Sequence, residues 1–334
     1  MSKSILVVGS GAIGAIAGVN LLSEGHKVDF VDANAAHVAA VRESGLRLSG
    51  VRDITVSANI MLPEEVSGSY DIVLLAVKAP HTQSTLGMIE KILAPHGCVV
   101  SLQNGLEEYR IARVVGDKRT IGAYLTFGGY FVEPGHIKNG GGGSFKIGEI
   151  DGAMTDRIRM LGELLAPVHK VDITDNIFGY LWAKMALGAV YFGTAIADMD
   201  VVDIYQRPAA RRVLARICGE VTAVADAHGI SIETSDGFDP KAFRNGGTDE
   251  ALMQASWDAQ TAYWNSHDNK RTGVWRDLAT FKRPTEVDFQ VLPVIELGRE
   301  RGVSTPALIA LRDAVKAVET GKAELGIALL EGLE

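Results

Sequence analysis

Residues 5–14 read ILVVGSGAIG, and this stretch decides the fold. Its first four residues are apolar, which is typical of a short strand buried on both faces. The glycines that follow have the spacing G-x-G-x-x-G, and AIAGVNLLSEG continues with a helical pattern. A strand that turns through such glycines into a helix is the fingerprint of a dinucleotide-binding βαβ unit.

Each glycine of this turn has its own role in the fingerprint. Gly9 permits the tight turn, Gly11 lets the backbone approach a pyrophosphate, and Gly14 lets the helix pack on the strand. Free N–H groups at the helix N-terminus favour an anion there. The predicted cofactor cradle comprises Gly9, Ser10, Gly11, Ala12, Ile13 and Gly14. The alternative is a glycine-rich turn without a ligand.

An acidic residue, Asp32, ends the second predicted strand 18 residues after Gly14. A carboxylate near this spacing accepts hydrogen bonds from the adenosine ribose and repels a 2′-phosphate. The next four residues, 33–36, include no Arg or Lys. The sequence therefore favours NAD(H), with NADP(H) as the alternative cofactor. Asp32 as an ordinary turn residue is the other interpretation.

Strands alternate with helical patterns up to about residue 130, which predicts an α/β fold with a doubly wound parallel sheet. Residues 128–148 are rich in glycine and predict an antiparallel extension or hairpin near the sheet edge, or else a flexible loop. From about Asp175 the spacing becomes helical, and Gly229 and Gly302 end two helices. We expect a dinucleotide-binding domain at 1–174 and a helical substrate and dimerisation domain at 175–334.

The bulk composition limits the partners of the chain. A net charge of −8 offers no general attraction to nucleic acid or to anionic lipid. No apolar stretch reaches the roughly 18 to 20 residues that span a bilayer, and the first apolar run is too short for a signal peptide. We therefore expect a cytoplasmic protein. The two cysteines form no metal-type cluster, and no metal site is predicted.

Four later motifs complete the pattern: AVKA with Lys78, QNG with Asn104, LWAK with Lys184 and RPTEVD with Glu286. With GSGAIG at the start, their order and spacing resemble the ketopantoate reductase (2-dehydropantoate 2-reductase) family over nearly the whole chain. The resemblance implies a Rossmann-type sheet followed by a helical domain similar to the C-terminal domain of 6-phosphogluconate dehydrogenase. It also implies hydride transfer between a nicotinamide and a 2-oxo or 2-hydroxy acid.

The resemblance assigns roles to these residues. Lys184 gives a proton to the carbonyl oxygen, because hydride addition creates an alkoxide that a nearby cation stabilises. Lys78 and the catalytic Asn104 follow strands at the edge where ligands bind, and face the cofactor. Glu286 binds a substrate hydroxyl or holds the lysine. Each residue also has an alternative without a catalytic role. These are a side chain that snorkels from an apolar helix for Lys184, a solvated strand end for Lys78, a turn residue for Asn104 and a first-turn helix residue for Glu286.

The chain also departs from the family pattern. Typical members carry asparagines four and eight residues after the lysine, where this chain has Gly188 and Phe192, and a serine twelve residues before the glutamate, where it has Val274. We infer that the polar grip on ketopantoate is lost. The candidate substrate contacts are Gly188, Phe192, His267, Arg271, Val274, Trp275 and Arg276. The alternative for the 267–276 stretch is a charged loop with a packed tryptophan.

Three hypotheses follow. The first is an NAD(H)-dependent dehydrogenase of this family that interconverts a 2-oxo and a 2-hydroxy acid. The second is authentic 2-dehydropantoate reduction with NADPH for pantothenate biosynthesis. The third is a non-catalytic NAD(H)-binding sensor. A homodimer is also expected, because helical second domains of this kind pair through apolar faces.

Overall fold

The computed structural model describes residues 3–333. The chain forms two compact units, Met1–Ile177 and Phe178–Glu334. The division falls within the first turn of the helix α6 (Ile177–Ile196), and the roles expected of the two domains stay predictions.

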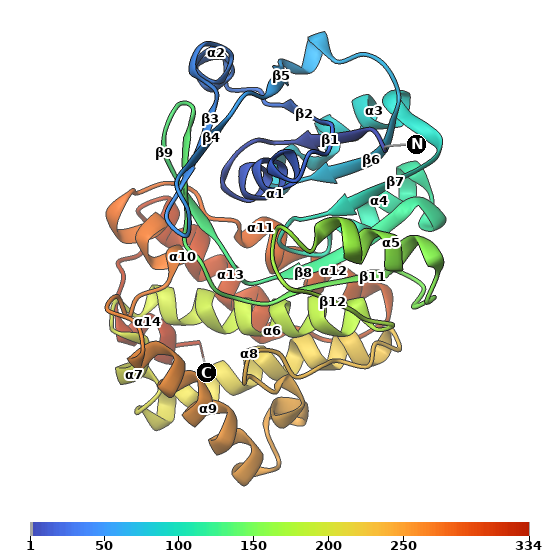
Figure 1. Cartoon of the computed structure of the whole chain (residues 1–334). Coiled ribbons are helices and arrows are strands. Elements are labelled where there is room, and N and C mark those ends of the chain that lie inside the picture. Colours follow the sequence, from blue (N-terminus) through green and yellow to red (C-terminus); the bar gives the residue numbers. More distant parts are fainter. Residues whose placement is uncertain (1–2, 334) are drawn as a thin grey trace. The chain divides into compact units, whose positions relative to one another are not determined.

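The first unit is built on an eight-stranded sheet (Figure 1). Its strands are β1 (Ile5–Val8), β2 (Val28–Val31), β5 (Asn59–Met61), β6 (Tyr70–Leu75), β7 (Leu93–Ser101), β8 (Thr120–Leu125), β11 (Phe145–Glu149) and β12 (Val171–Ile173). They lie in the order β12-β11-β8-β7-β6-β1-β2-β5, and every neighbouring pair is parallel except β8 with β11. The doubly wound Rossmann-type sheet is confirmed.

Helices cover both faces of this sheet. They are α1 (Ala12–Ser23), α2 (Ala35–Ser44), α3 (Thr82–Ile92), α4 (Glu107–Val115) and α5 (Asp156–Leu165). Successive strand residues point to opposite faces, so Ile5 and Val7 pack in one core with α1 and α5, whereas Leu6 and Val8 pack in another with α3 and α4. This explains why all four residues of β1 are apolar.

A second, four-stranded sheet covers α1. Its strands are β3 (Leu46–Ser49), β4 (Ile54–Val56), β9 (Gly129–Glu133) and β10 (His136–Asn139), in the order β4-β3-β10-β9. Helix α1 contacts β1 and β2 of the large sheet and β3, β9 and β10 of the small one. The predicted hairpin exists as β9 and β10, but it belongs to this small sheet, and β11 provides the antiparallel extension of the large one.

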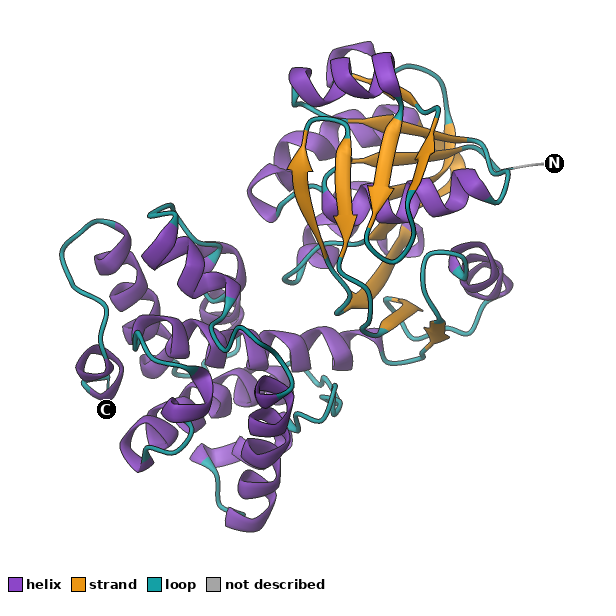
Figure 2. Ribbon diagram, turned by 60° about the vertical axis from the view of Figure 1, so that its left-hand side comes forward, coloured by secondary structure: helices purple, strands orange, loops and turns teal. Residues whose placement is uncertain are grey.

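The second unit is helical, as predicted (Figure 2). Its helices are α6, α7 (Val201–Ile204), α8 (Pro208–Ala227), α9 (Glu250–Asn265), α10 (Gly273–Trp275), α11 (Val287–Gln290), α12 (Leu292–Glu300), α13 (Pro306–Glu319) and α14 (Ile327–Glu331). Gly229 and Gly302 follow α8 and α12 with φ of +71° and +70°, which confirms their predicted place at helix ends.

Shorter turns connect these elements. Turns of 3₁₀ helix lie at Pro63–Glu65, Ala79–His81, Asp117–Arg119 and Pro240–Gly246, and a π-helical turn lies at Arg276–Thr280. Within residues 3–333, no helix has both the length and the apolar character that a bilayer crossing requires.

Candidate active site

The glycine turn lies where the strand order of the large sheet reverses, between β1 and β6. Gly9 has a φ of +92°, and a Cβ there would lie 2.8 Å from the backbone nitrogen of Val77. A Cβ on Gly14 would lie 1.9 Å from the Gly9 carbonyl oxygen. A Cβ on Gly11, the N-cap of α1, would meet nothing within 4 Å. The turn is therefore closed toward the protein and open at Gly11, which suits a dinucleotide pyrophosphate.

Asp32 is tied to this turn. Its Oδ2 accepts hydrogen bonds from the backbone nitrogen of Ser10 at 2.8 Å and from its hydroxyl at 2.9 Å. Its Oδ1 accepts from the backbone nitrogen of Asn34 at 2.9 Å. A carboxylate has about four acceptor positions, so one more donor, such as a ribose hydroxyl, can still be accommodated. Asp32 thus holds the glycine turn, and its contact with a ribose stays a prediction.

A buried histidine lies beside this tether. His37 stands in the first turn of α2 with 1% of its surface exposed, and its Nδ1 accepts from the backbone nitrogen of Gly135 at 3.0 Å. Gly135 forms the turn between β9 and β10. Burial lowers the pKa of His37 below 6.5, and the nearby Asp32 carboxylate offsets part of that effect. The ring therefore joins α2 to the turn between β9 and β10 of the small sheet.

We expect the stability of the wild-type chain to fall as the pH drops through 6.5, because the unfolded chain then binds a proton at His37 that the folded chain resists. Urea denaturation midpoints between pH 8 and pH 5 measure this. The Gln side chain also carries an acceptor, so His37→Gln is the matched control and should show a shallower decline. Equal declines in both proteins would contradict a role for His37.

The two strand-end residues, Lys78 and Asn104, lie on loops that follow β6 and β7, and both side chains are exposed. The buried Gln103 joins these loops, since its Nε2 donates to the Val77 carbonyl at 2.7 Å and to the Thr82 hydroxyl at 2.8 Å. Sequence reasoning did not single out Gln103, although it is the first residue of the QNG motif. These hydrogen bonds hold together the two loops that carry Lys78 and Asn104.

In the second unit, Lys184 lies on the partly open face of α6. Gly188 and Tyr191, four and seven residues later, are partly exposed on the same face. Phe192 is instead 1% exposed and lies in the core, so the expectation that it contacts substrate needs correction. Tyr191, which sequence reasoning missed, donates from its hydroxyl to the Gln260 carboxamide oxygen at 2.8 Å.

Glu286 stands at the N-cap of α11, and its side chain makes no capping hydrogen bond. Its Oε2 accepts from Nε2 of Gln290 at 3.0 Å. The carboxamide oxygen of Gln290 in turn faces α6, because a Cβ on Gly188 would lie 3.3 Å from it. A carboxamide from α11 thus lies beside Gly188, and the inference that the polar grip on ketopantoate is lost stays a prediction.

The predicted contacts between residues 267 and 276 separate into two groups. Arg271 pairs with Asp198 at 2.6 Å and Asp200 at 3.1 Å, and its guanidinium lies 4.4 Å from the Trp275 ring centroid. Trp275 donates to Asp198 at 2.8 Å. These contacts match the alternative of a charged loop with a packed tryptophan, and they neutralise Arg271. This group anchors the loop.

The remaining residues of this stretch are less constrained. His267 is exposed at the end of α9, with its Nδ1 2.8 Å from the Tyr263 carbonyl oxygen. Val274 and Arg276 are partly buried. Among residues 3–333, the Arg276 guanidinium has no ion pair or hydrogen-bond partner. Arg276 is therefore a better candidate than Arg271 for binding a substrate anion.

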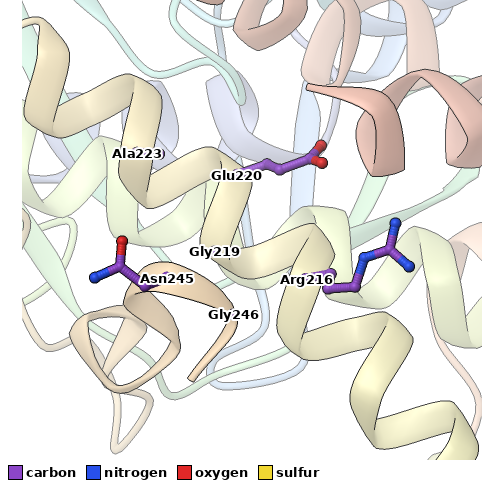
Figure 3. A pocket seen from close by; sticks show the side chains of 6 residues that line it. All are labelled: Arg216, Gly219, Glu220, Ala223, Asn245 and Gly246. Carbon is purple, nitrogen blue, oxygen red and sulfur yellow. The ribbon is translucent and has the colours of Figure 1, made fainter. Parts of the chain in front are cut away.

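A hollow of about 290 Å³ lies beside α8 in the second unit (Figure 3). Its lining residues are Arg216, Gly219, Glu220, Ala223, Asn245 and Gly246. Arg216 and Glu220 extend to one side and Asn245 to the other, so the polar groups do not converge. The Glu220 carboxylate caps α13, accepting from the backbone nitrogens of Ala307 and Leu308 at 2.8 Å each, and burial raises its pKa. We assign no ligand to this hollow.

Comparisons with known proteins agree with this arrangement. Residues 5–152 match the family model "ketopantoate reductase PanE/ApbA", and residues 176–319 match its C-terminal counterpart. The 2-dehydropantoate 2-reductase of Halobacterium salinarum is 26% identical over 322 residues, which cover 94% of this chain and 98% of that protein.

Two solved structures share the fold. A D-mandelate dehydrogenase in complex with NADH and anilino(oxo)acetate has a TM-score of 0.80 at 21% identity, covering 96% of this chain and 99% of the other. A ketopantoate reductase from Ralstonia eutropha has a TM-score of 0.78 at 24% identity, with the same coverage of each chain. Since the two family models together match most of its length, the chain belongs to the ketopantoate reductase PanE/ApbA family and is an oxidoreductase that acts on CH–OH groups.

Proposed function

We propose that this protein interconverts a 2-oxo acid and a 2-hydroxy acid with NAD(H) as the preferred cofactor. The observation that carries the proposal is the partly exposed face of α6, where Lys184 stands one turn from Gly188 and the Gln290 carboxamide, paired with Glu286, lies beside Gly188. The glycine turn in the first unit fits the dinucleotide. Family membership makes the chain an enzyme, so the sensor hypothesis is set aside.

The roles proposed for the residues are these. A bound nicotinamide supplies or accepts the hydride. The Lys184 Nζ holds the proton that neutralises the substrate oxygen when the carbonyl is reduced, and it takes that proton back in the oxidation. Arg276 binds the substrate carboxylate through its guanidinium. Asn104 and Lys78 line the cofactor side, on loops that Gln103 holds together.

The cofactor preference rests on Asp32. Its carboxylate repels a 2′-phosphate, and no Arg or Lys follows it to bind one. The D-mandelate dehydrogenase of similar fold binds NADH, which supports the same choice.

We expect kcat/KM with NADH to exceed that with NADPH by at least about tenfold, which corresponds to a difference of roughly 1.4 kcal/mol. Steady-state kinetics with both cofactors and one 2-oxo acid measure it. Asp32→Asn removes the charge but keeps hydrogen-bonding groups, and should narrow the ratio. A wild-type enzyme that prefers NADPH would refute the cofactor assignment.

The second candidate function is authentic 2-dehydropantoate reduction. The relative from Halobacterium salinarum is named a 2-dehydropantoate 2-reductase, and Gln290 places a carboxamide beside Glu286 despite Gly188. Rescue of a pantothenate auxotroph by this gene would support it. The homodimer and the cytoplasmic location stay predictions, and light scattering after size-exclusion chromatography tests the first.

A further inference from the structure

Gln290 connects two elements of the second unit. It is the last residue of α11, and its carboxamide nitrogen donates to Glu286 one turn earlier at 3.0 Å. Its carboxamide oxygen lies 3.3 Å from the position that a Cβ on Gly188 would take, inside the 3.4 Å at which ordinary contact begins. The Gln290 side chain therefore fills space that a side chain from α6 would otherwise use.

The direction of this carboxamide follows from hydrogen bonding. A carboxamide nitrogen donates hydrogen bonds and a carboxylate oxygen accepts them, so the Gln290 nitrogen faces Glu286 and the Gln290 oxygen faces Gly188. The pair thus offers two kinds of oxygen acceptor beside the open face of α6. A ligand that fits them must bring a hydrogen-bond donor, and on a small acid that donor is a hydroxyl group.

The separation between Lys184 and Gly188 along α6 indicates the length of such a ligand. Gly188 follows Lys184 by four residues, which is about 6 Å along an α-helix and the same helix face. One small acid can therefore present its carbonyl oxygen to Lys184 and a hydroxyl further along its chain to Gln290.

We propose that Gln290, whose side chain fills the space that Gly188 leaves open, determines substrate specificity. Its nitrogen orients Glu286, and its oxygen accepts a hydrogen bond from a hydroxyl on the substrate chain. This inference rests on the proposed function, since it requires Lys184 to act on a 2-oxo acid in the same place. It predicts that the enzyme discriminates between acids that differ by that one hydroxyl.

Two probes differ by that group alone, 2-dehydropantoate and 3,3-dimethyl-2-oxobutanoate. We expect the wild-type kcat/KM to be higher for the hydroxylated probe. Gln290→Met keeps the volume but removes both the acceptor and the donor to Glu286. It should lower kcat/KM for 2-dehydropantoate at least about tenfold more than kcat/KM for the other probe, as expected for the loss of one hydrogen bond to the substrate. Loss of the hydrogen bond that orients Glu286 should lower kcat/KM for both probes to a similar extent, so the ratio between the two probes reports the contact with the substrate hydroxyl. NADH affinity and melting temperature should stay the same.

A reciprocal variant separates positioning from general packing. Gly188→Asn combined with Gln290→Ala returns a carboxamide to the same space from α6, and should recover most of the lost preference for the hydroxylated probe. Gly188→Ala combined with Gln290→Ala is the matched control without a carboxamide, and should not. Gly188→Asn alone crowds the Gln290 oxygen and should lower activity. The effects of Gly188→Asn and Gln290→Ala on kcat/KM should therefore not add up in the double variant.

The outcomes distinguish the two proposals. If the wild type oxidises NADH with neither probe, and with no other 2-oxo acid, the proposed function fails and this inference fails with it. If the wild type is active and Lys184→Ala is not, the proposed function stands. Gln290 is then excluded as a specificity determinant if Gln290→Met lowers both probes equally, if it lowers neither, or if the double variant restores nothing.

Discussion

Replacing Lys184 by Ala should lower kcat by about 10²- to 10⁴-fold, the range over which a positioned acid or base contributes to proton transfer. The physical reason is that hydride addition to a ketone leaves a negative charge on oxygen, and the ammonium group is the proposed source of both stabilisation and proton. NADH affinity, measured by fluorescence titration, should change less than about twofold, because the glycine turn belongs to the first unit.

Two control variants sharpen this prediction. Lys184→Arg keeps the positive charge but cannot release a proton near neutral pH, so it should recover part of the loss at most. Lys322→Ala removes an exposed lysine at the C-terminal side of α13 and should leave kcat unchanged. Full activity in Lys184→Ala, with a 2-oxo acid that the wild type reduces, would remove the mechanism.

The Gly14→Ala substitution should destabilise the first unit by about 3 kcal/mol and abolish tight NADH binding. Its new Cβ would lie 1.9 Å from the Gly9 carbonyl oxygen and 2.9 Å from a methyl group of Val7. Overpacking of this kind costs roughly 1–3 kcal/mol or more where backbone must move. Because Gly9 lies in the cofactor turn, the shift also displaces the cradle.

Gly11→Ala is the matched control, since its Cβ would meet nothing within 4 Å. Its unfolding free energy should stay within about 1 kcal/mol of the wild type, the usual range for changes at an N-cap. Its NADH affinity should nevertheless fall at least about tenfold, because the methyl group occupies the open side of the turn. Calorimetric unfolding and NADH titration, done on both variants, separate packing from binding. If Gly14→Ala were as stable as the wild type, the close packing described for the turn would be wrong.

The large sheet could be predicted because its signals are local. The first strand, the glycine turn and α1 follow one another in a single stretch, and β1 is a continuous apolar run. The small sheet could not be predicted, because β3 has only four residues and pairs with β10, about ninety residues away. Alternation over three or four residues is too short to predict a strand.

Helix α9 has no clear signal of its own in the sequence, for a different reason. Its buried face consists of Ser256, Trp257, Gln260 and Trp264, so half of the inward side chains are polar. A helix whose buried face mixes amide, hydroxyl and indole groups lacks the apolar stripe on which a prediction depends. Specific hydrogen bonds, such as the one from Tyr191 to Gln260, take the place of that stripe, and they are visible only in the structure.

In the candidate site, too, local motifs could be predicted and contacts between distant residues could not. The motif residues could be identified from sequence, but their environment could not. Seven residues correspond to nearly two whole helical turns, so Tyr191 shares the face of Lys184 more closely than Phe192 does. The pairing of Arg271 with Asp198 joins residues more than seventy positions apart, and the replacement of a side chain on α6 by Gln290 on α11 joins residues about a hundred apart. No local pattern carries such information.

The sheet that covers α1 has a consequence for synthesis on the ribosome. Its last two strands in the sequence, β9 and β10, are made more than one hundred residues after α1, so the side of that helix that they cover stays exposed while the intervening chain is made. Pairing of β10 with β3 must then close a long loop, which slows folding and prolongs exposure of apolar surface. A nascent chain that stalls before β10 has left the ribosome should consequently depend on chaperones, whereas one that stalls after β10 has emerged can already enclose the helix.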